Sequence, residues 1–151
     1  MATVELLAEA SKSGLNIAVL SMPDLGVGAL ADAGWDLGHL ASIDVPISET
    51  ARAAMIAMDG FDVILLPMQA IGQPWRRVAA KARERKTALV VVDRGGDTRR
   101  RSILYAGGID AIVSPTGITW DGSLEGTVFG RPVLEISIEH RGRILRSSSA
   151  G

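Results

Sequence analysis

The feature that most limits the folds open to this chain is a series of apolar runs separated by helix-like stretches. Each run is almost uninterrupted, which is typical of strands that are covered on both faces. The runs are residues 15–21 (LNIAVLS), 61–67 (FDVILLP), 87–93 (TALVVVD) and 109–115 (IDAIVSP). Residues 37–43 form a weaker strand candidate, so the sequence predicts five strands.

Helical patterns occupy the intervals between these runs. Trp75, Val78, Ala79 and Ala82, for example, form one apolar stripe at helical spacing. Because strand and helix alternate with short links, the sequence predicts a parallel sheet with right-handed crossovers and helices on both faces. Helices are expected at residues 3–12, from Pro23-Asp24 to Gly34, from a Ser48 cap to Gly60, from Gln73-Pro74 onward, and at residues 97–106. The expected fold class is α/β, a doubly wound five-stranded parallel sheet.

The alternation ends after Pro115, and the remaining residues have no helical period. Residues 133–139 and 143–148 are strand-like and flank His140-Arg141-Gly142, a pattern that favours a β-hairpin. The predicted organisation has three parts. They are an N-terminal helix in residues 1–14, an α/β domain in residues 15–115, and a C-terminal extension with a β-hairpin in residues 116–151.

Composition narrows the class of protein further. Aromatic residues make up only 4% of the chain and apolar residues 47%, so the core must be aliphatic, which suits a parallel α/β sheet. The absence of cysteine excludes disulfides and thiolate chemistry and suits a reducing compartment. No apolar run reaches the roughly 20 residues that span a bilayer, and the first residues lack a signal-peptide pattern. We therefore expect a cytoplasmic protein without a membrane partner.

Charge is distributed unevenly along the chain. Residues 1–60 contain eight acids and two Lys or Arg, whereas residues 61–151 contain nine acids and fourteen Lys or Arg. Such polarity can steer a charged partner or favour head-to-tail pairing of two copies. The simpler interpretation is that the basic runs are solvated helix faces.

Two segments resemble the receiver domain, the phosphoacceptor module of two-component response regulators. Residues 61–72 (FDVILLPMQAIG) resemble its third strand and following loop. Residues 87–115 (TALVVVDRGGDTRRRSILYAGGIDAIVSP) resemble its fourth strand through its fifth without a gap. The resemblance extends over about residues 15–115 and implies a receiver-like, flavodoxin-like fold.

The positions that carry receiver chemistry are replaced in this chain. Where receivers bind magnesium with acids after the first strand, the chain has Ser21 and Met22, with Asp24 slightly beyond. The phosphoacceptor position is Pro67, which has no nucleophile. Asp93 stands at the hydroxyl position, and Ser114 at the lysine position. The resemblance therefore implies a degenerate phosphoacceptor pocket with no metal, no cofactor and no phosphotransfer.

Receivers with such losses are pseudo-receivers, which act through protein contacts. The resemblance thus predicts a non-enzymatic, phosphorylation-independent module for bacterial regulation or localisation that binds another protein or itself as a homodimer. Its signalling face would carry Arg99, Arg100, Arg101 and Tyr105, which suit an acidic protein surface. The alternatives for this arginine run are plain solvation and nucleic-acid binding. The acidic overall balance and the scarcity of aromatic residues argue against nucleic acid.

A second candidate site follows the strand at residues 87–93. Ligands of open α/β sheets favour the carboxyl ends of strands, and a helix N-terminus attracts anions. Arg94 and Arg99 could therefore hold a phosphate- or nucleotide-bearing ligand, although Asp97 can cap the helix and Asp93 repels anions. The predicted pocket residues are Asp24, Asp93, Arg94, Asp97 and Thr98. His39 and His140 have no nearby acids at ligand spacing and are expected to be solvated or hydrogen-bonded.

Overall fold

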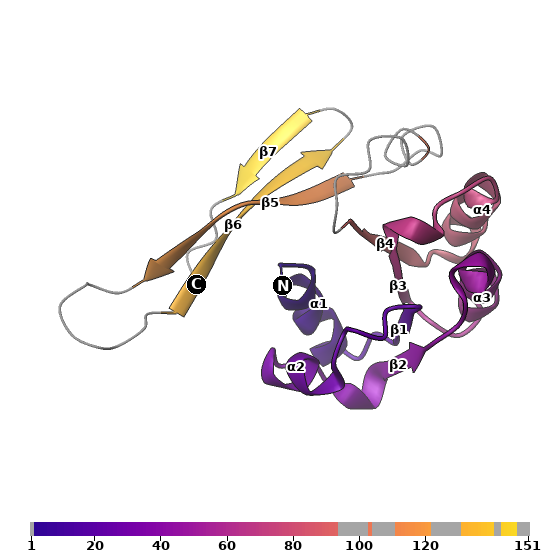
Figure 1. Cartoon of the computed structure of the whole chain (residues 1–151), viewed down its shortest axis with the longest axis horizontal. Coiled ribbons are helices and arrows are strands. Elements are labelled where there is room, and N and C mark those ends of the chain that lie inside the picture. The colour runs from indigo at the N-terminus through magenta and orange to yellow at the C-terminus, as the bar shows by residue number, and fades with distance from the viewer. Residues whose placement is uncertain (1, 94–102, 104–110, 122–130, 141–142, 148–151) are drawn as a thin grey trace. The chain divides into compact units, whose positions relative to one another are not determined.

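The structure is a computed structural model of the whole chain. It describes residues 2–93, 103, 111–121, 131–140 and 143–147, and side chains only within residues 7–93 and at Ile103. The chain divides into two compact units, residues 3–108 and residues 109–151 (Figure 1). Each unit has its own sheet.

The first unit is built on a four-stranded parallel sheet with the order β2-β1-β3-β4. Its strands are β1 (Ile17–Leu20), β2 (Leu40–Ile43), β3 (Val63–Pro67) and β4 (Ala88–Val92). All three pairings are parallel, including that of β3 with β4, in which Val63 lies opposite Ala88 and Pro67 opposite Val92. The predicted α/β class with a parallel sheet is confirmed.

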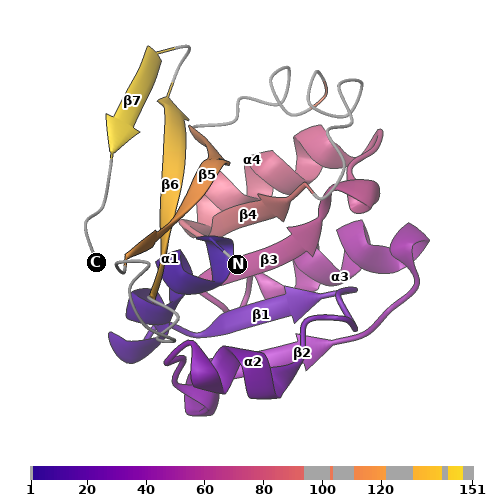
Figure 2. The ribbon, with the colours of Figure 1, turned by 60° about the vertical axis from the view of Figure 1, so that its left-hand side comes forward.

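Helices cover both faces of this sheet (Figure 2). On one face, α1 (Ala2–Lys12) and α2 (Val27–Asp32) close a core cluster in which Ala8 and Leu30 pack with Ile17 and Val63. The opposite face is covered by α3 (Thr50–Ala57) and α4 (Trp75–Arg85). The predicted inner stripe of α4 is confirmed, because all four of its residues are buried.

Short 3-10 helices modify two of the predicted elements. The strand expected at residues 37–43 begins only at Leu40, because a 3-10 helix η1 (Leu37–His39) precedes it. The Asp36 side chain accepts a hydrogen bond from the Gly38 amide and favours this turn. The prediction that Ser48 caps α3 is wrong. Ser48 lies inside a second 3-10 helix, η2 (Ile47–Glu49), and the N-cap residue Glu49 makes no side-chain capping bond.

The second unit is an antiparallel sheet with the order β5-β6-β7. Its strands are β5 (Ala111–Asp121), β6 (Arg131–His140) and β7 (Arg143–Ser147). The predicted hairpin is present, since β6 and β7 pair antiparallel from Ile136 with Ser147 to His140 with Arg143. The expected fifth parallel strand is not seen among the described residues. The run at residues 109–115 instead enters β5, which continues beyond Pro115 and satisfies its backbone groups against β6.

Candidate functional site

A hollow of about 290 Å³ lies where the parallel strands of the first unit end. From β1 the chain crosses to β2 on one side, and it then returns past β1 to β3 on the other side. The strand order thus reverses between β1 and β3, and open α/β sheets bind ligands at this point, outside the carboxyl ends of the strands. Every residue of the lining follows or ends a parallel strand. The lining residues are Ser21, Met22, Pro23, Asp24, Ile47, Pro67, Gln69 and Val92.

The chemistry of this lining is mostly apolar. Its polar groups are the Ser21 hydroxyl, the Gln69 amide and the carboxylate of Asp24. Among the described residues, Asp24 is the one charged side chain in the lining.

The Ser21 hydroxyl is engaged in a buried chain of hydrogen bonds. Ser21 Oγ donates to the Val45 carbonyl over 2.8 Å and lies 2.7 Å from Thr50 Oγ1. Either hydroxyl can donate in the second contact, and Thr50 Oγ1 also lies 3.4 Å from the Pro46 carbonyl. Ser21 is only 7% exposed and adopts a left-handed backbone with φ of 53°. The structure therefore gives Ser21 a local role, which is to tie the segment after β2 to the end of β1.

Pro67 occupies the end of β3 opposite Val92. Its backbone is extended, with φ of −77° and ψ of 150°, and its side chain is buried. Since proline has neither a nucleophilic side chain nor an amide hydrogen, this position can neither accept a phosphoryl group nor donate to an anion. The 3-10 helix η3 (Met68–Ala70) follows at once and carries Gln69 to the rim of the hollow.

The structure brings together three of the sequence-predicted residues, namely Ser21, Asp24 and Pro67. Asp93 follows the last residue of β4 and is half-buried. Ser114 lies in β5 of the second unit and not in the parallel sheet. The remaining predicted positions lie outside the described residues. These are Arg94, Asp97 and Thr98 of the ligand pocket, and Arg99, Arg100, Arg101 and Tyr105 of the partner face.

Sequence reasoning did not identify Ile47, Gln69 or Val92 as part of the site. Val92 could have been found, because it is the residue before Asp93 at the end of an apolar run. Ile47 and Gln69 stand on short 3-10 helices beyond the strand ends, and such turns leave no periodic signal.

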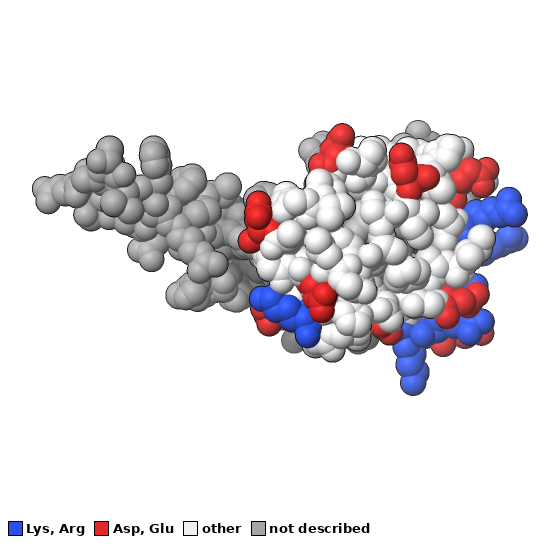
Figure 3. All heavy atoms as spheres, turned by 90° about the horizontal axis from the view of Figure 1, so that it is seen from below, with Lys and Arg blue, Asp and Glu red and all other residues white. Residues whose placement is uncertain are grey.

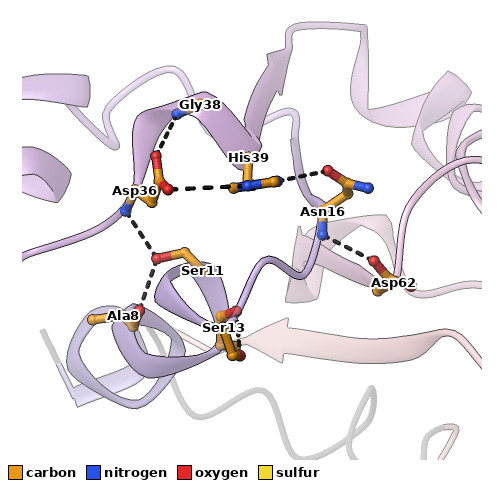
Figure 4. A network of polar contacts seen from close by, with 9 residues as sticks. Ala8, Ser11, Ser13, Asn16, Asp36, Gly38, His39 and Asp62 are labelled. Atoms are coloured by element: carbon orange, nitrogen blue, oxygen red, sulfur yellow. Dashed lines mark hydrogen bonds and ion pairs between the residues drawn. The ribbon is translucent and has the colours of Figure 1, made fainter.

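A separate polar network lies at the opposite, amino-terminal end of the sheet (Figure 4). The backbone N–H of Asn16 donates to Asp62 Oδ2 over 2.9 Å, and the side-chain oxygen Oδ1 of Asn16 lies 3.1 Å from His39 Nδ1. Ser11 Oγ is buried, donates to the Ala8 carbonyl and accepts from the Asp36 amide. His39 is therefore hydrogen-bonded, as expected, and the network joins α1, η1 and the start of β3.

The described residues contain no group of three or more acidic or histidine side chains arranged to hold a metal ion. None of the described helices has the length and apolar content that a membrane crossing requires.

The fold and the hollow define an α/β protein with a parallel sheet and a candidate site at the carboxyl ends of its strands. A family model, the MT3502 N-terminal domain, matches residues 1–97, and the chain belongs to this family. An uncharacterized protein of Mycobacterium tuberculosis (strain ATCC 25618 / H37Rv), Rv3395c, is 30% identical over 93 residues. The matched stretch covers 60% of this chain and 46% of that protein, so the chain corresponds to about half of the length of this relative.

Proposed function

We propose that this chain is a phosphorylation-independent pseudo-receiver that acts as a protein-interaction or self-association module and not as an enzyme. The parallel order β2-β1-β3-β4, with helices on both faces, is compatible with the first four strands of a receiver-like, flavodoxin-like domain. The bacterial source of its relative suits a role in bacterial regulation or localisation in the cytoplasm.

The observation that carries this proposal is the chemistry of the hollow. Pro67 stands where the resemblance puts the phosphoacceptor, and the hydroxyl of Ser21 is already bonded to Val45 and Thr50. Within the described part of the lining, Asp24 is the one carboxylate, and magnesium needs several oxygen ligands in octahedral geometry. A domain with this lining has lost the means of phosphotransfer while it keeps the sheet that supports protein contacts.

The first test is incubation of the chain with acetyl phosphate and magnesium, followed by intact-mass measurement. We expect the mass to stay unchanged. A receiver domain with its phosphoacceptor aspartate, treated in parallel, should gain one phosphoryl group. A stable gain of that size by this chain would overturn the proposal.

The second test concerns the partner face that the resemblance implies. Reversing Arg99, Arg100 and Arg101 to Glu should weaken self-association in sedimentation experiments without lowering the melting temperature. The matched control reverses Arg76, Arg77 and Arg83, which are exposed on α4. Equal association of both triple variants would exclude the residue 99–101 face.

The hollow also supports a second candidate function, that of a small-ligand sensor or enzyme. Its place at the switch point of the sheet is the specific observation in favour. A phosphate- or nucleotide-bearing ligand would need Arg94 or Arg99 as its cation, because the described residues of the lining supply none. A thermal-shift screen with nucleotides and cyclic dinucleotides tests this candidate, since a ligand of the native state raises the melting temperature.

A further inference from the structure

The strand β2 is an edge of the parallel sheet, and within the described part of the chain β1 is its single neighbour. The Ser21 amide donates to the Ile43 carbonyl, so the backbone groups of Ile43 point toward β1. Along a strand these groups alternate from one side to the other. The N–H and C=O groups of Ala41 therefore also face β1, whereas those of Leu40 and Ser42 point away from the sheet. The Leu40 amide already donates to the Leu37 carbonyl at the end of η1, so the groups open to a new strand are the Leu40 carbonyl and both backbone groups of Ser42.

This edge is protected by its shortness alone among the devices that limit strand addition. Natural edge strands are short or carry a charge, a proline or a bulge; Leu40–Ile43 has four residues, reads Leu-Ala-Ser-Ile and pairs with β1 in unbroken register. Ser42 is exposed. Two large apolar side chains stand beyond the ends of the strand, Leu37 at 40% exposure and Ile47 at 44% exposure.

The stretch of chain that carries the edge is acidic. Between Lys12 and Arg52 the chain has no Lys or Arg. Five acids fall in the same interval, namely Asp24, Asp32, Asp36, Asp44 and Glu49. In Figure 1, β2 lies along the lower side of the first unit, and the view of that side shows a broad uncharged area bordered by acidic side chains and, in places, by Lys or Arg (Figure 3).

From these observations we infer that the β2 edge binds an extended segment of another protein that has an apolar centre and Lys or Arg at its ends. The segment adds to the sheet as a fifth strand, donates a hydrogen bond to the Leu40 carbonyl and exchanges hydrogen bonds with the N–H and C=O groups of Ser42. Its apolar side chains cover Leu37 and Ile47, and its basic ends meet the surrounding acids. Two copies of this chain paired through β2 would bring like charges together, so a foreign basic segment fits better.

This inference rests on the proposed interaction function and names a surface for it. A suitable probe is a short synthetic peptide of alternating valine and threonine with lysines at both ends. Binding is followed by amide NMR and by fluorescence anisotropy. We expect saturable binding that weakens as salt is raised, and slower hydrogen exchange at the amide of Ser42 than in the free protein.

Two matched variants test the backbone contact itself. Ser42→Pro removes an outward N–H that makes no bond within the sheet, so it should leave folding intact and weaken peptide binding by about tenfold or more. Ser42→Ala keeps that N–H and should bind as the parent does. Asp44→Asn with Glu49→Gln should weaken binding of the lysine peptide and reduce its salt dependence, while a peptide with glutamates at its ends should bind neither form.

Three results would overturn the inference. The first is no saturable binding at millimolar peptide, and the second is equal binding by Ser42→Pro and Ser42→Ala. The third is a dimer of the free chain that Ser42→Pro dissociates, which would assign the edge to a second copy. These outcomes are independent of the acetyl phosphate experiment, because a chain that accepts a phosphoryl group could still bind the peptide at β2.

Discussion

The strands β3 and β2 belong to the same sheet but show different sequences and different burial. All five residues of β3 are buried, whereas β2 has three half-buried residues and one exposed residue. The central strand reads as an uninterrupted apolar run, and the edge strand mixes apolar and small residues. This difference indicates that β3 mainly stabilises the core. The strand β2 also belongs to the sheet, but one side of its backbone remains accessible.

The largest expected difference between the two strands is in their packing. Ile64 in β3 is fully buried, so Ile64→Ala should lower the free energy of unfolding by about 3 to 4 kcal/mol. The matched change in β2, Ile43→Ala, should cost about 1 kcal/mol because that side chain is half-buried. Urea denaturation measures both, and equal losses would contradict the contrast.

The next effect concerns the two sides of β2. Ala41→Pro removes an amide that faces β1, so it should destabilise the protein by about 2 to 3 kcal/mol. Ser42→Pro removes an amide that faces away, and it should cost less than about 1 kcal/mol. The melting temperatures of the pair report the difference. If Ser42→Pro is the more harmful, the assigned direction of the backbone groups is wrong.

A smaller effect is expected for the hydrogen bonds by which Ser21 holds the segment that follows β2. Ser21→Ala breaks the contacts with Val45 and Thr50 and should lower stability by about 1 to 2 kcal/mol. Ser21→Gly also loses them but relieves the left-handed backbone, so it should be more stable than Ser21→Ala by about 1 kcal/mol. In either Ser21 variant, the rate of amide hydrogen exchange should increase more in β2 than in β3. An equal increase of the exchange rate in both strands would show that the Ser21 contacts stabilise the whole sheet and not β2 alone.

The smallest effect is expected at Lys86, and it should leave the difference between β2 and β3 unchanged. Lys86 ends α4 with φ of 56°, a conformation that favours glycine, and its side chain is exposed. Lys86→Gly should therefore raise the free energy of unfolding by about 0.5 to 1 kcal/mol. Since Lys86 lies in neither strand, the exchange rates of β2 and β3 should fall by the same factor in native-state measurements. A selective change in one strand would reveal an unrecognised coupling.

The central part of the fold could be predicted because burial on both faces leaves a plain apolar run. The run at residues 61–67 contains β3, and that at residues 87–93 contains β4. The start of β2 could not be predicted, because a local bond from Gly38 to Asp36 favours a 3-10 turn over extension. The apolar run at residues 109–115 identifies a strand, but its antiparallel partner β6 lies far along the chain and leaves no local signal.

The candidate site was predictable to the extent that it consists of strand ends. Ser21 and Pro67 were identified because each closes an apolar run, and parallel strands bring such ends to one edge. The engagement of the Ser21 hydroxyl was not predictable, because Thr50 is 29 positions away and reaches it only after folding.

The interval without Lys or Arg has a practical result in mass spectrometry. Complete digestion with trypsin leaves Ser13 to Arg52 as one peptide, which carries β1, β2 and the half of the hollow formed by Ser21 to Ile47. A photo-crosslinker would thus label this same peptide whether the molecule that carries it binds at the β2 edge or in the hollow. A second protease that cuts after acidic residues would be needed to distinguish the two sites.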